Sequence, residues 1–133
     1  MLDPMADALP AARPGPLSRL APPLALMALI FLLSAQPDLS TGLGTWDLIL
    51  RKGAHMAEFG LLWWLLWRAG GHRHPLLAAA ATVLYAASDE WHQSFVEGRV
   101  GTPVDVLVDA AGVALAWVLS TRRRPARTQR IRV

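Results

Sequence analysis

The run from Pro75 to Ala87 holds no charged residue and ends directly on the polar sequence Ser-Asp-Glu-Trp-His-Gln. If this run lies in a membrane, Asp89, Glu90 and His92 lie at the membrane boundary or inside it. Ionisable side chains in that position cost free energy and need partners. Any fold of this chain must therefore bring partner groups to this end of the run.

The composition indicates a membrane protein. The chain has 133 residues, which predicts a single domain, and 53% of them are hydrophobic while only 17% are charged. A small soluble domain has much surface to cover with polar residues, so this balance is unusual for one. The sequence has no cysteine, which excludes a disulfide framework and a zinc site built from thiolates.

The positive charge is concentrated at the C-terminal end. The net charge is +3, and six of the thirteen Lys and Arg residues lie after residue 121. A basic end beside an apolar block is typical of the cytoplasmic flank of a membrane segment. Because no recognised nucleic-acid-binding motif accompanies the charge, we expect no nucleic acid partner.

The apolar residues form four blocks, which predict an all-α, four-helix integral membrane bundle. The expected helices cover residues 17–35, 47–68, 75–94 and 103–121. The core of the first block, Leu24 to Ala35, is short for a membrane crossing, which takes about twenty residues. A signal peptide is the alternative interpretation of this block.

Capping residues and glycines set the expected helix ends. Thr45 or Asp47 can cap the second helix, and the Gly70-Gly71 pair can end it. Thr102-Pro103-Val104-Asp105 combines a capping Thr, a Pro at the first position and an acid at the third. We expect a disordered tail over residues 1–16, a four-helix transmembrane domain over 17–121 and a basic cytoplasmic tail over 122–133.

The distribution of Lys and Arg predicts the orientation of the bundle. With four crossings, both termini and the turn over residues 69–74 share one side, which holds ten of the thirteen Lys and Arg residues. The positive-inside rule then places both termini on the cytoplasmic side of the membrane. Trp67 and Trp117 fall near the inner boundary, and Trp46 and Trp91 near the outer one, as expected of aromatic belts.

This orientation brings distant polar residues to one level, in the outer half of the membrane. We expect a polar cluster whose members come from the start of the second helix, the end of the third, the following loop and the start of the fourth. They are Lys52, His55, Glu58, Asp89, Glu90, His92, Gln93, Arg99, Asp105 and Asp109.

Helical spacing predicts which faces meet. Tyr85, Ser88, Asp89 and His92 follow the spacing i, i+3, i+4, i+7 and so form one stripe. His55, Glu58 and Leu62 form a second stripe, and Asp105, Asp109, Gly112 and Ala116 form a third. Gly112 and Ala116 are small enough to let a neighbouring helix approach closely.

The polar residues also occur as three motifs. These are Lys52-x-x-His55-x-x-Glu58, then Ser88-Asp89-Glu90-x-His92-Gln93-x-Phe95-x-x-Gly98-Arg99, and then Asp105-Val106 followed by Gly112. The motifs resemble those of the VanZ-like family of small bacterial membrane proteins, over residues 30–119. The resemblance implies a membrane protein related to one associated with low-level resistance to teicoplanin, a lipoglycopeptide that binds cell-wall precursors. The chain departs from the family pattern at Asp109, where Asn is more frequent.

Three roles for the polar cluster remain open from the sequence. The first is a structural core whose polar groups satisfy one another and fix the helix register. The second is a site open to the outer leaflet, in which Arg51, Lys52 and Arg99 hold a lipid-linked phosphate or an antibiotic carboxylate. The third is a membrane-embedded hydrolase or transferase that uses His92, His55 and Asp89 as acid, base or metal ligands.

We expect a non-catalytic envelope protein of the second kind. Its partners would be membrane lipids and a lipid-linked cell-wall precursor or a lipoglycopeptide, and through them it would modulate susceptibility to teicoplanin. This hypothesis needs no cofactor and no resident metal.

Overall fold

The computed structural model describes residues 14–37 and 42–123, and within them the protein is all-helical. The four helices are α1 (Pro16–Ser34), α2 (Thr45–Ala69), α3 (Pro75–Gln93) and α4 (Pro103–Arg122). The predicted all-α fold with four helices is therefore confirmed. Most of the two predicted terminal tails lies outside the described residues.

Proline and glycine explain most of the helix ends. Proline stands in the first turn of α1, α3 and α4, where a backbone N–H would have no helical partner. The Thr102 side chain caps α4 by accepting a hydrogen bond from the backbone N–H of Asp105, at 3.3 Å. The predicted cap of α2 is wrong: the N-cap position is Gly44, which has no side chain to accept a capping hydrogen bond. At its other end α2 stops at Gly70, and Gly71 takes a φ of 67°, which suits a residue without a side chain.

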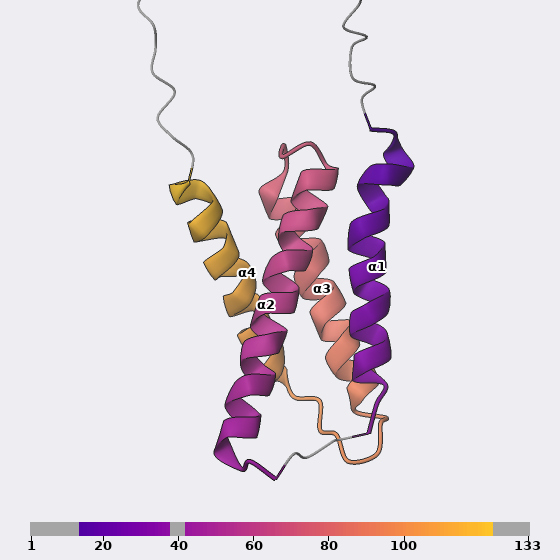
Figure 1. Cartoon of the computed structure of the whole chain (residues 1–133), viewed down its shortest axis with the longest axis vertical. Helices are drawn as coiled ribbons and strands as arrows, with labels where there is room; N and C mark the ends of the chain where they lie inside the picture. The colour runs from indigo at the N-terminus through magenta and orange to yellow at the C-terminus, as the bar shows by residue number, and fades with distance from the viewer. Residues whose placement is uncertain (1–13, 38–41, 124–133) are drawn as a thin grey trace, which may run out of the picture.

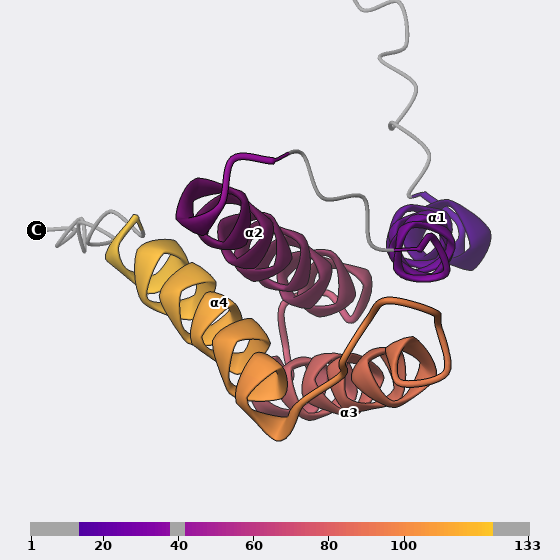
Figure 2. The same ribbon diagram turned by 90° about the horizontal axis from the view of Figure 1, so that it is seen from below.

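The helices run alternately up and down (Figure 1). The start of α1, the turn between α2 and α3, and the end of α4 lie at one end of the bundle. The opposite end, made by the start of α2, the end of α3 and the start of α4, is called the polar end below. Seen along the bundle, α2, α3 and α4 group together and α1 stands to one side (Figure 2). The most extensive contact is between α2 and α4, and α1 packs mainly against α2.

The apolar core lies toward the end opposite the polar end, and aromatic rings dominate it. Trp63 is fully buried, with its ring stacked 5.2 Å from that of Trp67 and 5.6 Å from that of Trp117, measured between ring centroids. Its indole Nε1 donates a hydrogen bond to the carbonyl of Pro75 at 3.1 Å. Trp67 and Trp117 therefore help to fill the core of the bundle rather than forming only a belt at its surface.

Glycine allows α2 and α4 to touch backbone to backbone. A Cβ atom on Gly112 would lie 2.2 Å from the carbonyl oxygen of Met56, and one on Gly60 would lie 2.9 Å from the carbonyl oxygen of Gly112. The predicted role of Gly112 in a close helix approach is confirmed. Met56 directly follows His55 in α2, and Gly112 comes one turn after Asp109 in α4. The contact between Met56 and Gly112 therefore also fixes the separation of His55 and Asp109.

The outer surface of the bundle is apolar. Two helices, α1 and α4, are long and apolar enough to cross a membrane, since their most apolar 18-residue stretches have mean hydropathies of 1.8 and 1.7. Only 17% of each 18-residue stretch is buried inside the protein, whereas a core helix of a soluble protein is mostly buried. The other two helices, α2 and α3, do not meet the same criteria of length and hydropathy. Leu76, Leu84 and Leu107 are among the large apolar side chains that remain exposed.

Candidate polar site at the end of the bundle

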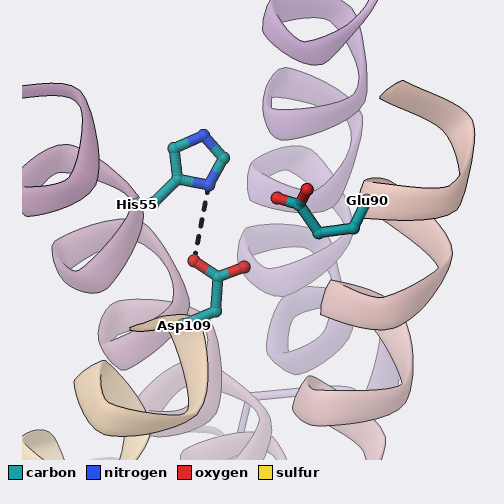
Figure 3. Close-up of side chains that lie close together, drawn as sticks. All are labelled: His55, Glu90 and Asp109. Carbon is teal, nitrogen blue, oxygen red and sulfur yellow. Dashed lines mark ion pairs between the residues drawn. The ribbon is translucent and has the colours of Figure 1, made fainter. Parts of the chain in front are cut away.

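Three helices contribute one ionisable side chain each to the centre of the polar end. His55 comes from α2, Glu90 from α3 and Asp109 from α4, and they point toward one another (Figure 3). Their ligand atoms lie within 4.8 Å of one another, and His55 Nδ1 is 3.4 Å from Asp109 Oδ1. Asp109 is 1% exposed and Glu90 is 5% exposed, so two carboxylates are buried beside one imidazole.

Lys52 and Asp105 form an ion pair between α2 and α4. Lys52 Nζ lies 2.5 Å from Asp105 Oδ1, and the Thr102 hydroxyl donates to the other carboxylate oxygen at 2.6 Å. Asp105 therefore has a partner on each oxygen in addition to its place in the helix cap. The two side chains are 37% and 27% exposed, so water screens this pair and it adds at most about 1 kcal/mol to stability.

Asp89 ties α3 to α1. Its Oδ2 accepts hydrogen bonds from the Ser34 hydroxyl at 2.8 Å and from Gln93 Nε2 at 2.9 Å, while Oδ1 is buried without a hydrogen-bond partner. The sequence analysis did not assign Ser34 to the cluster. Its signal was weak, a single hydroxyl at the end of the first apolar block, and only the packing of α1 on α3 gives it a role.

Arg99, in the connection between α3 and α4, has only neutral partners among the described residues. Its guanidinium donates to Gln93 Oε1 and to the carbonyl of Leu33, both at 3.4 Å. The Nε atom is buried and has no hydrogen-bond partner. By contrast, Arg51 pairs with Asp47 at 3.1 Å. Arg99 is thus a cation whose hydrogen-bonding capacity is poorly used by the fold.

The face that α3 buries differs from the predicted stripe. Ser88 is exposed and its hydroxyl donates to the carbonyl of Tyr85, so its predicted place on the inward stripe is wrong. The fully buried residues at this end are Ala86, Asp89, Glu90 and Gln93, which is the predicted pattern shifted by one residue, or about 100°. The reason is that α3 packs against α2 and α4 more extensively than against α1, which turns Glu90 inward.

His92 lies apart from the centre of the site. Its ring stacks on Phe31 of α1, with 4.5 Å between ring centroids, and its buried Nδ1 has no hydrogen-bond partner. Among the described residues, no hydrogen bond or ion pair joins His92 to Asp89 or to His55. The sequence analysis grouped His55 with His92 and Asp89 as candidate catalytic residues. The structure instead places His55 with Asp109 and Glu90.

Two adjacent cavities open at the polar end, each of about 290 Å³, and they share Arg51, His55 and Arg99 as lining residues. Several of the predicted cluster residues line the first cavity. They are Lys52, Glu90, Gln93, Asp105 and Asp109. Glu58 lines the second cavity together with Ser34 and Asp47, and it has no hydrogen bond or ion pair with another described residue. Asp89 and His92 line neither cavity.

The charges in the first cavity are unevenly satisfied. Lys52 and Asp105 neutralise each other, whereas within residues 14–37 and 42–123 Arg99 has no carboxylate partner and Asp109 has only His55. This arrangement can bind an anion at Arg99. His55, Glu90 and Asp109 are also the residues that could hold a metal ion.

A comparison with protein families identifies the chain. The family model described as VanZ/LLP1 matches residues 18–124, which includes all four helices except the first two residues of α1. No curated protein and no solved structure matches the chain. The match extends over the apolar helices and the polar residues at their ends, so the chain belongs to the VanZ/LLP1 family and is a VanZ-like membrane protein.

Proposed function

We propose that this protein crosses the bacterial inner membrane four times, with both termini in the cytoplasm and the polar end in the outer half of the membrane. The helices are about 28 to 38 Å long at 1.5 Å per residue, which matches a hydrocarbon core of about 30 Å. Among the described residues, the end with the start of α1, the α2–α3 turn and the end of α4 holds more Lys and Arg than the polar end does. They are Arg19, Arg68, Arg73, Arg122 and Arg123, against Arg51, Lys52 and Arg99. Reporter fusions at residue 72 and after residue 121 should both report a cytoplasmic position.

We further propose that the polar end binds the anionic head of a lipid-linked or lipophilic ligand in the outer leaflet. The observation that carries this proposal is Arg99, a partly buried guanidinium that lines both cavities and meets only neutral oxygens at 3.4 Å. A guanidinium binds phosphate and carboxylate groups through two parallel hydrogen bonds, which neutral oxygens do not replace.

The size and position of the cavities suit this ligand class. About 290 Å³ is near the lower limit of small-molecule sites and accommodates a phosphate or a small phosphorylated head group. Arg51 and Lys52 also line this cavity, but their carboxylate partners Asp47 and Asp105 largely neutralise them, which leaves Arg99 as the cation for the ligand. The apolar chain of the ligand would lie along the exposed Leu side chains of the helices, in contact with lipid. A ligand of this class among the cell-wall precursors, or a lipoglycopeptide, would connect the protein to teicoplanin susceptibility.

Binding is tested with full-length protein in nanodiscs that contain either a polyprenyl phosphate or only neutral lipid. We expect saturable binding of the phosphate lipid and a loss of roughly ten-fold or more in Arg99→Ala, since hydrogen bonds to charged groups contribute about 1.5–3 kcal/mol. Arg99→Lys should retain part of the affinity. Arg73→Ala, in the turn at the other end of the bundle, is the control and should bind like the wild type.

The cellular consequence is tested in a strain that lacks the gene. We expect its susceptibility to lipoglycopeptides to change, the wild-type gene to reverse the change, and the Arg99→Ala gene to fail although its protein inserts normally. Restoration by Arg99→Ala would remove the link between the cavity and susceptibility.

A second candidate is a membrane-embedded hydrolase acting on a lipid-linked phosphate. The contact of 3.4 Å between His55 and the buried Asp109 favours it, because a carboxylate orients an imidazole that acts as a base. His55 would take a proton from water, and the water oxygen would attack phosphorus. The P–O bond to the leaving group would break as the leaving-group oxygen takes a proton from solvent, and His55 would then release its proton to solvent. Release of phosphate by the wild type but not by His55→Gln would support hydrolysis. No turnover of polyprenyl mono- or diphosphate by the wild type would exclude this candidate function.

A further inference from the structure

We infer that His55, Glu90 and Asp109 form a binding site for a divalent transition-metal ion, with Zn²⁺ as the best match. This site goes beyond the anion binding proposed above and would exist whether or not a lipid ligand is present. Each of the three residues comes from a different helix, so the ion would hold α2, α3 and α4 together at the polar end (Figure 3).

The donor atoms are available because the fold leaves them unused. Asp109 is 1% exposed, and neither of its carboxylate oxygens has a hydrogen-bond partner. Glu90 is also buried, and no hydrogen bond or ion pair joins its side chain to another described residue. Asp109 has the 3.4 Å contact with His55, and two buried carboxylates beside one imidazole are costly unless a further cation compensates them.

The nearby basic side chains do not supply that cation. Lys52 pairs with Asp105, one turn earlier on α4, and Arg99 contacts Gln93 and a backbone carbonyl. Among the described residues, His55 is the one basic side chain that reaches Asp109. An imidazolium carries one positive charge at most, which leaves the second carboxylate uncompensated.

The distances suit metal coordination. Ligand bonds of about 2.0–2.2 Å to Zn²⁺ place neighbouring ligand atoms roughly 3–4 Å apart. The contact of 3.4 Å between His55 Nδ1 and Asp109 Oδ1 already has this length. The separations within the group reach at most 4.8 Å, so a side-chain rotation that moves Glu90 by about 1 Å completes the set. The contact between Gly112 and Met56 holds the two backbones that carry His55 and Asp109 in place.

The donor types favour a transition metal over Mg²⁺ or Ca²⁺. An imidazole nitrogen suits Zn²⁺ and its neighbours in the first transition row, whereas Mg²⁺ and Ca²⁺ prefer a set of oxygen donors. Three protein ligands leave a fourth position open, as in catalytic zinc sites. The same three residues line the first cavity with Arg99, so the open position would accept water or an anionic oxygen from that cavity.

The test measures metal binding by the full-length protein in detergent, without lipid ligand. His72 and His74 are first replaced by Gln, and the affinity tag contains no histidine, so that no other histidine pair binds the ion. Metal-free protein is titrated calorimetrically with Zn²⁺, Mn²⁺, Mg²⁺ and Ca²⁺. We expect one saturable Zn²⁺ site per chain, weaker Mn²⁺ binding, and no comparable binding of Mg²⁺ or Ca²⁺.

Two substitutions assign the site. Asp109→Asn and His55→Gln should each weaken Zn²⁺ binding by roughly a hundred-fold or more, since losing even an outer partner of a metal ligand costs 10–100-fold. Glu97→Gln neutralises an exposed carboxylate in the connection between α3 and α4 that lines neither cavity, and it should alter the affinity by less than about three-fold.

Absence of saturable Zn²⁺ binding to the wild type would overturn the inference, as would Zn²⁺ binding that survives both substitutions. Equal affinity for Mg²⁺ or Ca²⁺ would also count against it. Because a substituted protein can fail to fold, Co²⁺ is added to the wild type as a second measurement. Visible d–d bands that are more intense than those of aqueous Co²⁺, and that Zn²⁺ abolishes, would support the site. A spectrum like that of aqueous Co²⁺ would contradict it.

Discussion

The two halves of α2 sit in opposite environments. The second half places Trp63 in a core where its ring stacks on two others and its N–H is hydrogen-bonded. The first half places His55 in a cluster where both oxygens of Asp109 and the Nε of Arg99 are buried without hydrogen bonds. A fold under selection for stability alone would satisfy both regions equally well. The contrast supports the proposal that the aromatic end stabilises the bundle while the polar end serves to bind a ligand.

The largest effect on stability is expected from Trp63→Ala. Removing a fully buried aromatic side chain leaves a cavity and typically costs about 3–5 kcal/mol. We expect this loss in unfolding experiments in detergent micelles. Trp64→Ala is the matched control, because Trp64 is the neighbouring tryptophan and is exposed. Equal losses for the two variants would show that the aromatic end does not hold the bundle together.

A somewhat smaller effect is expected from Gly112→Ala. The added Cβ would lie 2.2 Å from the carbonyl oxygen of Met56, so α2 and α4 must separate, at a cost of about 2 kcal/mol. Because this contact also sets the distance between His55 and Asp109, binding at the polar end should weaken too. Gly53→Ala is the control, since nothing lies within 4 Å of the added atom, and it should leave stability unchanged or slightly higher. A Gly112→Ala protein as stable as Gly53→Ala would contradict the close approach.

The smallest effect on stability, and the sharpest contrast, is expected from Asp109→Asn. The change removes a buried charge that has no hydrogen bond and only a 3.4 Å contact with His55, and it keeps the shape of the side chain, so the free energy of unfolding should change by less than about 1 kcal/mol. Asp105→Asn should lower it by up to about 1 kcal/mol, because Asp105 has Lys52 and Thr102 as partners. Both values come from denaturant titrations. If Asp109→Asn is the more destabilised of the two, the cluster serves to hold the helices together rather than to bind a ligand.

The sequence predicts the helices well because their ends depend on local chemistry. Pro75, Pro103 and the Thr102 cap act within one turn, and so do the glycines after α2. The alternation of four apolar blocks also explains why α2, α3 and α4 bring polar residues to one end. The missed cap of α2 is a local error, since Gly44 precedes the helix where Thr45 or Asp47 was expected to cap it.

The pairing within the polar end could not be predicted from the sequence. Helical spacing gives the face of a residue only to within about one position, so the stripe through Ser88 was displaced and Glu90 was left off it. Which carboxylate meets Lys52 and which meets His55 depends on the vertical register of α2 on α4. That register follows from the contact of Gly112 with Met56, which no single-helix pattern contains. The role of Ser34 depends in the same way on how α1 packs against α3.

The most direct test compares ligand affinity and stability in the same preparations of wild-type and Arg99→Ala protein. Polyprenyl phosphate binding in nanodiscs and the unfolding midpoint in detergent are both measured. If Arg99 serves a ligand, the affinity falls by roughly ten-fold or more while the unfolding free energy changes by less than about 1 kcal/mol, since its partners are neutral and distant. Unchanged affinity together with a marked loss of stability would contradict this account and make Arg99 part of the scaffold.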